Sequence, residues 1–118
     1  MEQKFRVEFL EEAKKFLDNL EDKSRQKIYY NIRKAIQIND NELFKKLKDD
    51  IWEFRTLYNK TYFRLFAFWD KTNNEDTVVI STHGLIKKTD KTPGGEFDRA
   101  ENLRIQYFKD KSKKNENI

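Results

Sequence analysis

The stretch Ile51–Asp70, with the sequence IWEFRTLYNKTYFRLFAFWD, gives the clearest fold signal in this chain. Aromatic and β-branched side chains fill both halves, which is typical of strands. Asn59-Lys60 separates the halves and predicts a two-residue hairpin turn, because asparagine tolerates positive φ. This turn places Arg55 directly opposite Arg64.

The predicted hairpin has two unlike faces, because side chains alternate along a strand. One face is almost wholly apolar and should pack on helices. The other carries Arg55 and Arg64 at its centre and should open outward. Like charges directly opposite each other destabilise a sheet by roughly 0.2–1 kcal/mol. A receptor for one phosphate would explain the pair, since each guanidinium offers a planar fork of donors. The alternative is that Glu53 and a nearby carboxylate neutralise both arginines.

The rest of the chain supplies further strands and helices around this hairpin. We expect strands at Lys4–Leu10 and about Thr77–Ile86, and helices at Leu10–Leu20, about Ser24–Ile38 (capped by Asp22 or Ser24), and after Gly95. Residues 39–46 read as a loop. The order β-α-α-β-β-β-α predicts an α+β fold with an antiparallel sheet core and helices packed on one face. We expect one domain over residues 1–108 and a frayed basic tail over 109–118.

The composition narrows the class of protein. Ten Phe, five Tyr and two Trp among 118 residues are too many large apolar side chains for a disordered chain. The absence of cysteine excludes disulfides, and a single histidine makes a structural zinc site very unlikely. We expect no membrane span and no metal or other cofactor, and the charged N-terminal segment favours a cytoplasmic protein. The net charge of +4 permits a nucleic-acid partner without requiring one.

Clustered cations near the hairpin suggest a basic patch suited to a phosphate backbone. The runs KKLK (residues 45–48) and KK (residues 87–88) flank these strands, although each run alone is more often a solvated surface. Tyr62 and Phe66 are candidates for base stacking, with cover under the last helix as the alternative. His83 is the only side chain whose unperturbed pKa lies near neutrality and is a candidate general acid or base, although a lone histidine is usually structural.

Two segments resemble the RelE/HigB superfamily of type II toxins, and most closely its phage-derived HigB-like branch. These are KKLKDDIWEFRTLYNKTYFRLFAFWD (residues 45–70) and VVISTHGLIKKTDKTP (residues 78–93). The resemblance implies a RelE-like fold and a ribosome-dependent mRNA interferase. Such an enzyme cuts the message in the ribosomal A site. Its chemistry is metal-free: the ribose 2′-OH attacks the adjacent phosphorus and the 5′-oxygen leaves.

The resemblance also implies residue roles and partners. It implies catalytic roles for Arg55, Arg64, Lys87 and Lys88, and it strengthens the catalytic candidate His83, which falls inside the matched motif. Together with the basic patch, the RNA-binding candidates are Lys45, Lys46, Lys48, Tyr62 and Lys91. The C-terminal tyrosine of RelE is not transferred to Tyr107, so His83, Glu53 and the lysines remain alternatives for proton transfer. The implied partners are a helix-turn-helix, HigA-like antitoxin, the message on the ribosome, and operator DNA through the antitoxin only. A ParE-like gyrase inhibitor or a non-catalytic RNA-binding relative is the alternative function.

Overall fold

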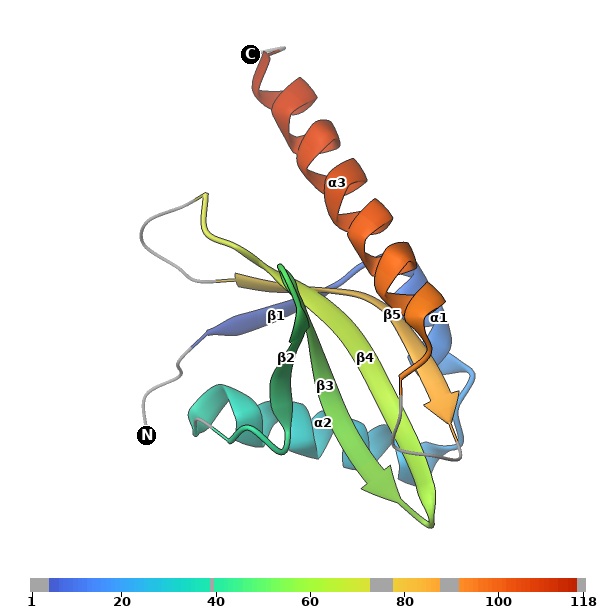
Figure 1. Ribbon diagram of the computed structural model, residues 1–118. Coiled ribbons are helices and arrows are strands. Elements are labelled where there is room, and N and C mark those ends of the chain that lie inside the picture. The colour runs from blue at the N-terminus through green and yellow to red at the C-terminus, as the bar shows by residue number, and fades with distance from the viewer. Residues whose placement is uncertain (1–4, 39, 73–77, 88–91, 117–118) are drawn as a thin grey trace.

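The computed structural model describes residues 5–38, 40–72, 78–87 and 92–116. Its elements, in chain order, are β1 (Arg6–Phe9), α1 (Glu11–Asp18), α2 (Asp22–Gln37), β2 (Phe44–Lys48), β3 (Ile51–Tyr58), β4 (Thr61–Asp70), β5 (Val78–Lys87) and α3 (Gly94–Glu116). The five strands form one sheet in the order β1-β5-β4-β3-β2 (Figure 1). This arrangement confirms the α+β class and is compatible with a RelE-like fold.

The helices cover both faces of the sheet, which corrects the prediction of helices on one face. One apolar core lies between α1, α2 and the sheet and includes Leu17, Ile32 and Leu65. A second core lies under α3 and includes Phe66, Phe68 and Ala100. In Figure 1, α2 and α3 lie on opposite sides of the strands, and the C-terminal end of α3 extends beyond the sheet. The face that carries the arginines is therefore partly covered by α3.

The hairpin of β3 and β4 confirms the predicted turn and register. Asn59 and Lys60 have φ values of 51° and 61°, as a two-residue turn of this type requires. Arg55 pairs with Arg64, and Glu53 pairs with Phe66. Every residue from Trp52 to Tyr58 thus keeps the face that the sequence pattern assigned to it.

Strand β2 occupies a segment that was predicted to be mostly loop. Its side chain Phe44 is 8% exposed and stacks on Phe54 with ring centroids 4.3 Å apart. This aromatic contact fixes a short edge strand whose lysines face solvent. The basic run concealed the strand, since only Phe44 and Leu47 of its residues are apolar. The sheet is also not wholly antiparallel, because β1 pairs with β5 in parallel.

The start of α2 and the end of α3 differ from the prediction. Glu21 occupies the N-cap of α2, in place of the predicted Asp22 or Ser24. Helix α3 continues to Glu116, past the predicted boundary at residue 108. The side chains Tyr107 and Lys111 donate hydrogen bonds of 2.5 and 2.7 Å to Oδ2 of Asp70 at the end of β4. These bonds tie the second half of α3 to the sheet.

Candidate functional site

A cluster of cations surrounds one carboxylate at the end of the face shared by β3, β4 and β5. Glu53 Oε1 lies 3.8 Å from Nε of Arg55 and 3.7 Å from Nε of Arg64. Register explains this proximity, because Arg55 and Arg64 are directly paired and Glu53 lies two residues before Arg55 on the same face. The predicted carboxylate neighbour is therefore present, but it serves two guanidinium groups at once.

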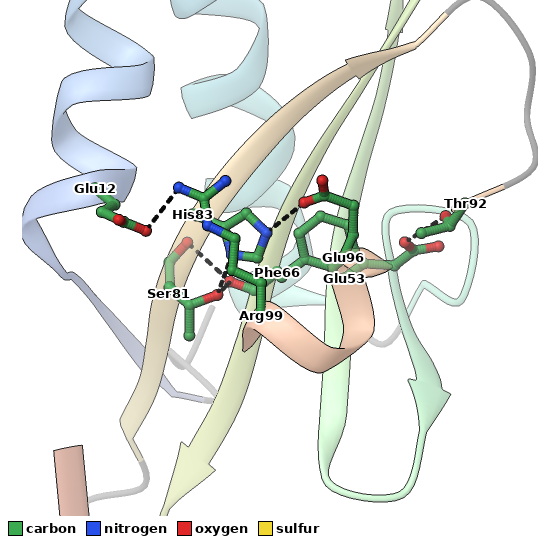
Figure 2. A network of polar contacts seen from close by, with 9 residues as sticks. Glu12, Glu53, Phe66, Ser81, His83, Thr92, Glu96 and Arg99 are labelled. Atoms are coloured by element: carbon green, nitrogen blue, oxygen red, sulfur yellow. Dashed lines mark hydrogen bonds and ion pairs between the residues drawn. The ribbon is translucent and has the colours of Figure 1, made fainter. Parts of the chain in front are cut away.

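A threonine joins the same carboxylate to a lysine on β5. The hydroxyl of Thr92 donates to Glu53 Oε2 at 3.2 Å and accepts from Lys87 Nζ at 2.7 Å (Figure 2 shows the Thr92–Glu53 bond). Sequence reasoning did not single out Thr92. Its place next to Pro93 within the motif KTDKTP was the available signal, but only the fold brings residue 92 back to residue 53. Glu53, Arg55, Arg64, Lys87 and Thr92 are called the cation cluster below.

The cation cluster is less open than the sequence suggested. The side chain of Arg64 is only 2% exposed and that of Arg55 is 21% exposed. Arg64 also donates from Nη1 to the carbonyl oxygen of Phe63 at 3.1 Å, and its guanidinium carbon lies 5.5 Å from the ring centroid of Tyr62. The arginine face is thus open to solvent at its outer end, which is the end toward the hairpin turn, where Arg55 and Tyr62 reach solvent.

A pocket of about 540 Å³ opens at this outer end. Its lining residues are Lys27, Tyr30, Asn31, Lys34, Glu42, Leu43, Arg55, Thr56, Leu57, Tyr62 and Arg64. Strand β2 pairs with β3 from Ile51 to Phe54, and beyond Phe54 the amide of Arg55 donates to the carbonyl oxygen of Leu43 at 2.8 Å. The pocket lies along this part of β3, next to α2 and the chain before β2.

The remaining predicted RNA-binding cations do not lie together. Lys45 pairs with Glu53 across β2 and β3 and so shares the face of the cation cluster. Lys48 lies 4.9 Å above the ring of Phe97 on α3. Lys46 pairs with Trp52 and so points to the opposite face, away from the cluster. The predicted residues Lys88 and Lys91 lie outside the described residues.

His83 occupies a buried position under the start of α3, 1% exposed. Its Nε2 lies 2.7 Å from Oε2 of Glu96, and its Nδ1 lies 3.0 Å from Oγ1 of Thr82. The imidazole stacks on Phe66 with centroids 4.8 Å apart, and Figure 2 shows His83 and Glu96 together beside this ring. Burial lowers the pKa of His83, and the hydrogen bond to Glu96 offsets only part of this effect. A neutral imidazole that donates to Glu96 fits these contacts.

A β-bulge in β5 sets this position of His83. Leu65 pairs with Gly84 whereas Ala67 pairs with Ser81, so Thr82 and His83 together face Phe66. The hydroxyl of Ser81 donates to the carbonyl oxygen of Phe66 at 3.2 Å. The hydroxyl of Thr82 lies 3.3 Å from the same oxygen and, beside a neutral imidazole, donates to Nδ1 of His83. The geometry places His83 with Phe66 and α3, and none of its polar contacts is with the cation cluster. It therefore favours the structural alternative, and a catalytic role for His83 remains a prediction.

Within the described ranges, no three His, Asp or Glu side chains gather as they would around a metal ion. No helix of that part of the chain is long and apolar enough to cross a bilayer.

A family model described as "Phage derived protein Gp49-like (DUF891)" matches residues 15–105. The chain belongs to this Gp49-like family. It is a toxin-like family related to RelE and HigB and is associated with the toxins of toxin–antitoxin systems. The match spans α2, β2, the hairpin, β5 and the first half of α3, and so includes the whole cation cluster. No curated protein matched this chain.

Proposed function

We propose that this Gp49-like protein is a HigB-like toxin that cleaves messenger RNA on the ribosome. The observation that carries the proposal is the cation cluster, in which Arg55 and Arg64 lie 3.8 and 3.7 Å from Glu53 and Lys87 reaches the same carboxylate through Thr92. Two guanidinium forks and an ammonium group are thus gathered beside a pocket. Such groups suit the charge of a phosphodiester.

The chemistry proposed for the cluster is transfer of a phosphoryl group within the message. The ribose 2′-oxygen attacks the adjacent phosphorus while its proton passes to Glu53. The 5′-oxygen leaves with a proton from Lys87, and a 2′,3′-cyclic phosphate remains. Arg55 and Arg64 stabilise the charge that develops on the phosphorane oxygens. Thr92 holds Glu53 and Lys87 at a fixed separation, so both proton-transfer groups are positioned before the substrate arrives.

The partners follow from the same proposal. The toxin acts on the message in the ribosomal A site and is inhibited by a helix-turn-helix, HigA-like antitoxin. Operator DNA is contacted through the antitoxin only, and the protein works in the cytoplasm without a metal or other cofactor.

Replacement of the arginines tests the proposal. Arg64→Ala should lower the single-turnover cleavage rate about a hundredfold, because loss of one group that stabilises transition-state charge costs on the order of 3 kcal/mol. Arg64 is buried, so Arg64→Lys serves as a second variant that keeps the charge and loses the planar fork. Arg33→Ala on the exposed side of α2 is the matched control and should cleave normally. Folded Arg64 and Arg55 variants that cleave like the wild type would refute the proposal.

A further inference from the structure

Helix α2 forms the second wall of the pocket beside the cation cluster. Lys27, Tyr30, Asn31 and Lys34 recur at helical spacing and line the pocket as one stripe. The sequence pattern of α2 predicts only an apolar stripe that faces the core. The cations that line the pocket are therefore drawn from the sheet and from a helix that packs on its other face.

The position of this stripe is fixed by a buried polar contact. Nδ2 of Asn31 donates to Oγ1 of Thr56 on β3 at 3.1 Å, and Asn31 is 9% exposed. Thr56 is the neighbour of Arg55 in the strand, so this bond sets the register of α2 against the arginine pair. The stripe is thus held on secondary structure and not on a loop, as Figure 1 shows for α2 beside β3.

The pocket combines positive charge with two aromatic rings, of which Tyr30 is exposed and Tyr62 is half-buried. Lys27, Lys34, Arg55 and Arg64 line it with Glu42 as the single carboxylate among the lining residues. Tyr30 is 54% exposed, and Lys27 Nζ lies 4.9 Å from its ring centroid. Tyr62, at the sheet side, has the guanidinium of Arg64 at 5.5 Å. Each wall therefore carries one ring with a cation against it.

We infer that the α2 stripe binds the nucleotides that flank the cleaved phosphate of a single-stranded RNA. Tyr30 stacks on a base, and Lys27 and Lys34 contact the phosphates on either side of it. Aromatic platforms beside cations are the usual means of holding single strands without base-specific readout. An acidic peptide would use the same cations but would gain little from the rings of Tyr30 and Tyr62. The inference rests on the proposed function and extends its substrate site to α2.

Binding of a non-cleavable RNA tests the inference separately from cleavage. The probe is a short single-stranded 2′-O-methyl RNA, which lacks the attacking hydroxyl, titrated into the labelled protein and followed by amide NMR shifts. The wild type should show shifts along the α2 stripe and at Tyr62. Tyr30→Ala and Lys34→Ala should each raise Kd at least about fivefold, the lower range for loss of a stacking or phosphate contact. Tyr30→Phe keeps the ring and should bind like the wild type.

Arg33→Ala is the matched control, because Arg33 is an exposed cation next to Lys34 that does not line the pocket. Wild-type affinity in both Tyr30→Ala and Lys34→Ala would overturn the inference, while loss of cleavage in Arg64→Lys would still support the nuclease. Normal cleavage by the Arg64 variants together with weakened binding by the α2 variants would refute the proposed role of the arginines in cleavage and support the RNA surface. Binding of polyglutamate but not RNA by the wild type would overturn the RNA assignment in favour of an acidic peptide.

Discussion

Replacement of His83 by glutamine separates a structural role from proton transfer. His83 is 1% exposed, contacts Glu96 at 2.7 Å and Thr82 at 3.0 Å, and stacks on Phe66. Glutamine can still donate an N–H to Glu96, but it has no ring to stack on Phe66. The variant should therefore weaken the attachment of α3 to the sheet and leave the cation cluster unchanged.

The expected loss of stability follows from the contacts removed. An aromatic stack contributes about 0.5–1.5 kcal/mol beyond its buried area, and a neutral hydrogen bond contributes about the same. Loss of the stack and of the Thr82 contact should together lower the free energy of unfolding by roughly 1–3 kcal/mol. For a chain of this size, that corresponds to a Tm lower by roughly 5–15 °C.

The pH dependence of stability provides a second, independent test of the structural role of His83. Burial lowers the pKa of His83 in the folded protein, so the unfolded chain takes up a proton first as the pH falls. This contribution to stability is complete above the unfolded pKa of about 6.5 and is lost as the pH falls from there toward the folded pKa. The wild type should lose stability below pH 6.5 by at most about 1.4 kcal/mol per pH unit from this group. His83→Gln should lack this component.

The assay measures thermal unfolding between pH 5 and 7.5 and single-turnover cleavage on the same preparations. The structural role predicts a lower Tm, a flatter pH dependence and normal cleavage per folded molecule. A general acid or base contributes roughly 10²–10⁴ in rate. An unchanged Tm with a loss of cleavage of that size would refute the structural role and return proton transfer to His83.

Two further substitutions test how the helices are attached to the sheet. Gly84→Ala should destabilise the fold by about 1–3 kcal/mol or more, because a Cβ at this position would collide with the ring of Phe16. A chemical denaturation midpoint equal to that of the wild type would contradict the packing of α1 on β5. Tyr107→Phe should cost about 1.5–3 kcal/mol at neutral pH, since it removes a hydrogen bond to the buried carboxylate of Asp70. Burial alone would raise the pKa of Asp70, but hydrogen bonds from Lys111, Tyr107 and Thr72 lower it well below its ordinary value. The stability from Asp70 is therefore present above about pH 4 and lost as the pH falls. The denaturation curves of wild type and Tyr107→Phe should then converge in acid. A difference between the two proteins that stays constant with pH would argue against this bond.

Local patterns predicted the hairpin because its signals lie within twenty residues of each other. Period-two alternation and the Asn59-Lys60 turn fix which residues face each other, and the observed pairing of Arg55 with Arg64 follows directly. The same alternation did not predict that α3 would cover Phe66 and Phe68 on the arginine face. That outcome depends on contacts between segments about thirty residues apart or more, which periodicity does not encode.

The cations of the candidate site could be predicted from the sequence, but their arrangement around Glu53 could not. Arg55, Arg64 and Lys87 were identified from charge and from a family motif, and the fold places them around Glu53. Thr92 and the α2 stripe were missed, because a threonine in a loop and a lysine on a helix look like ordinary surface residues. His83 was noted for its chemistry, yet its burial depends on a bulge that leaves no mark in the sequence pattern.

The central claim is that this chain cuts a message on the ribosome by attack of a ribose 2′-OH. The most direct measurement is to incubate the purified protein with ribosomes programmed with a defined message and to determine the chemistry of the new ends. We predict a cut in the A site that leaves a 2′,3′-cyclic phosphate upstream and a 5′-hydroxyl downstream, and no cut when the 2′-oxygen at that position is methylated. An intact message, or fragments that end in a 3′-hydroxyl and a 5′-phosphate, would contradict the account.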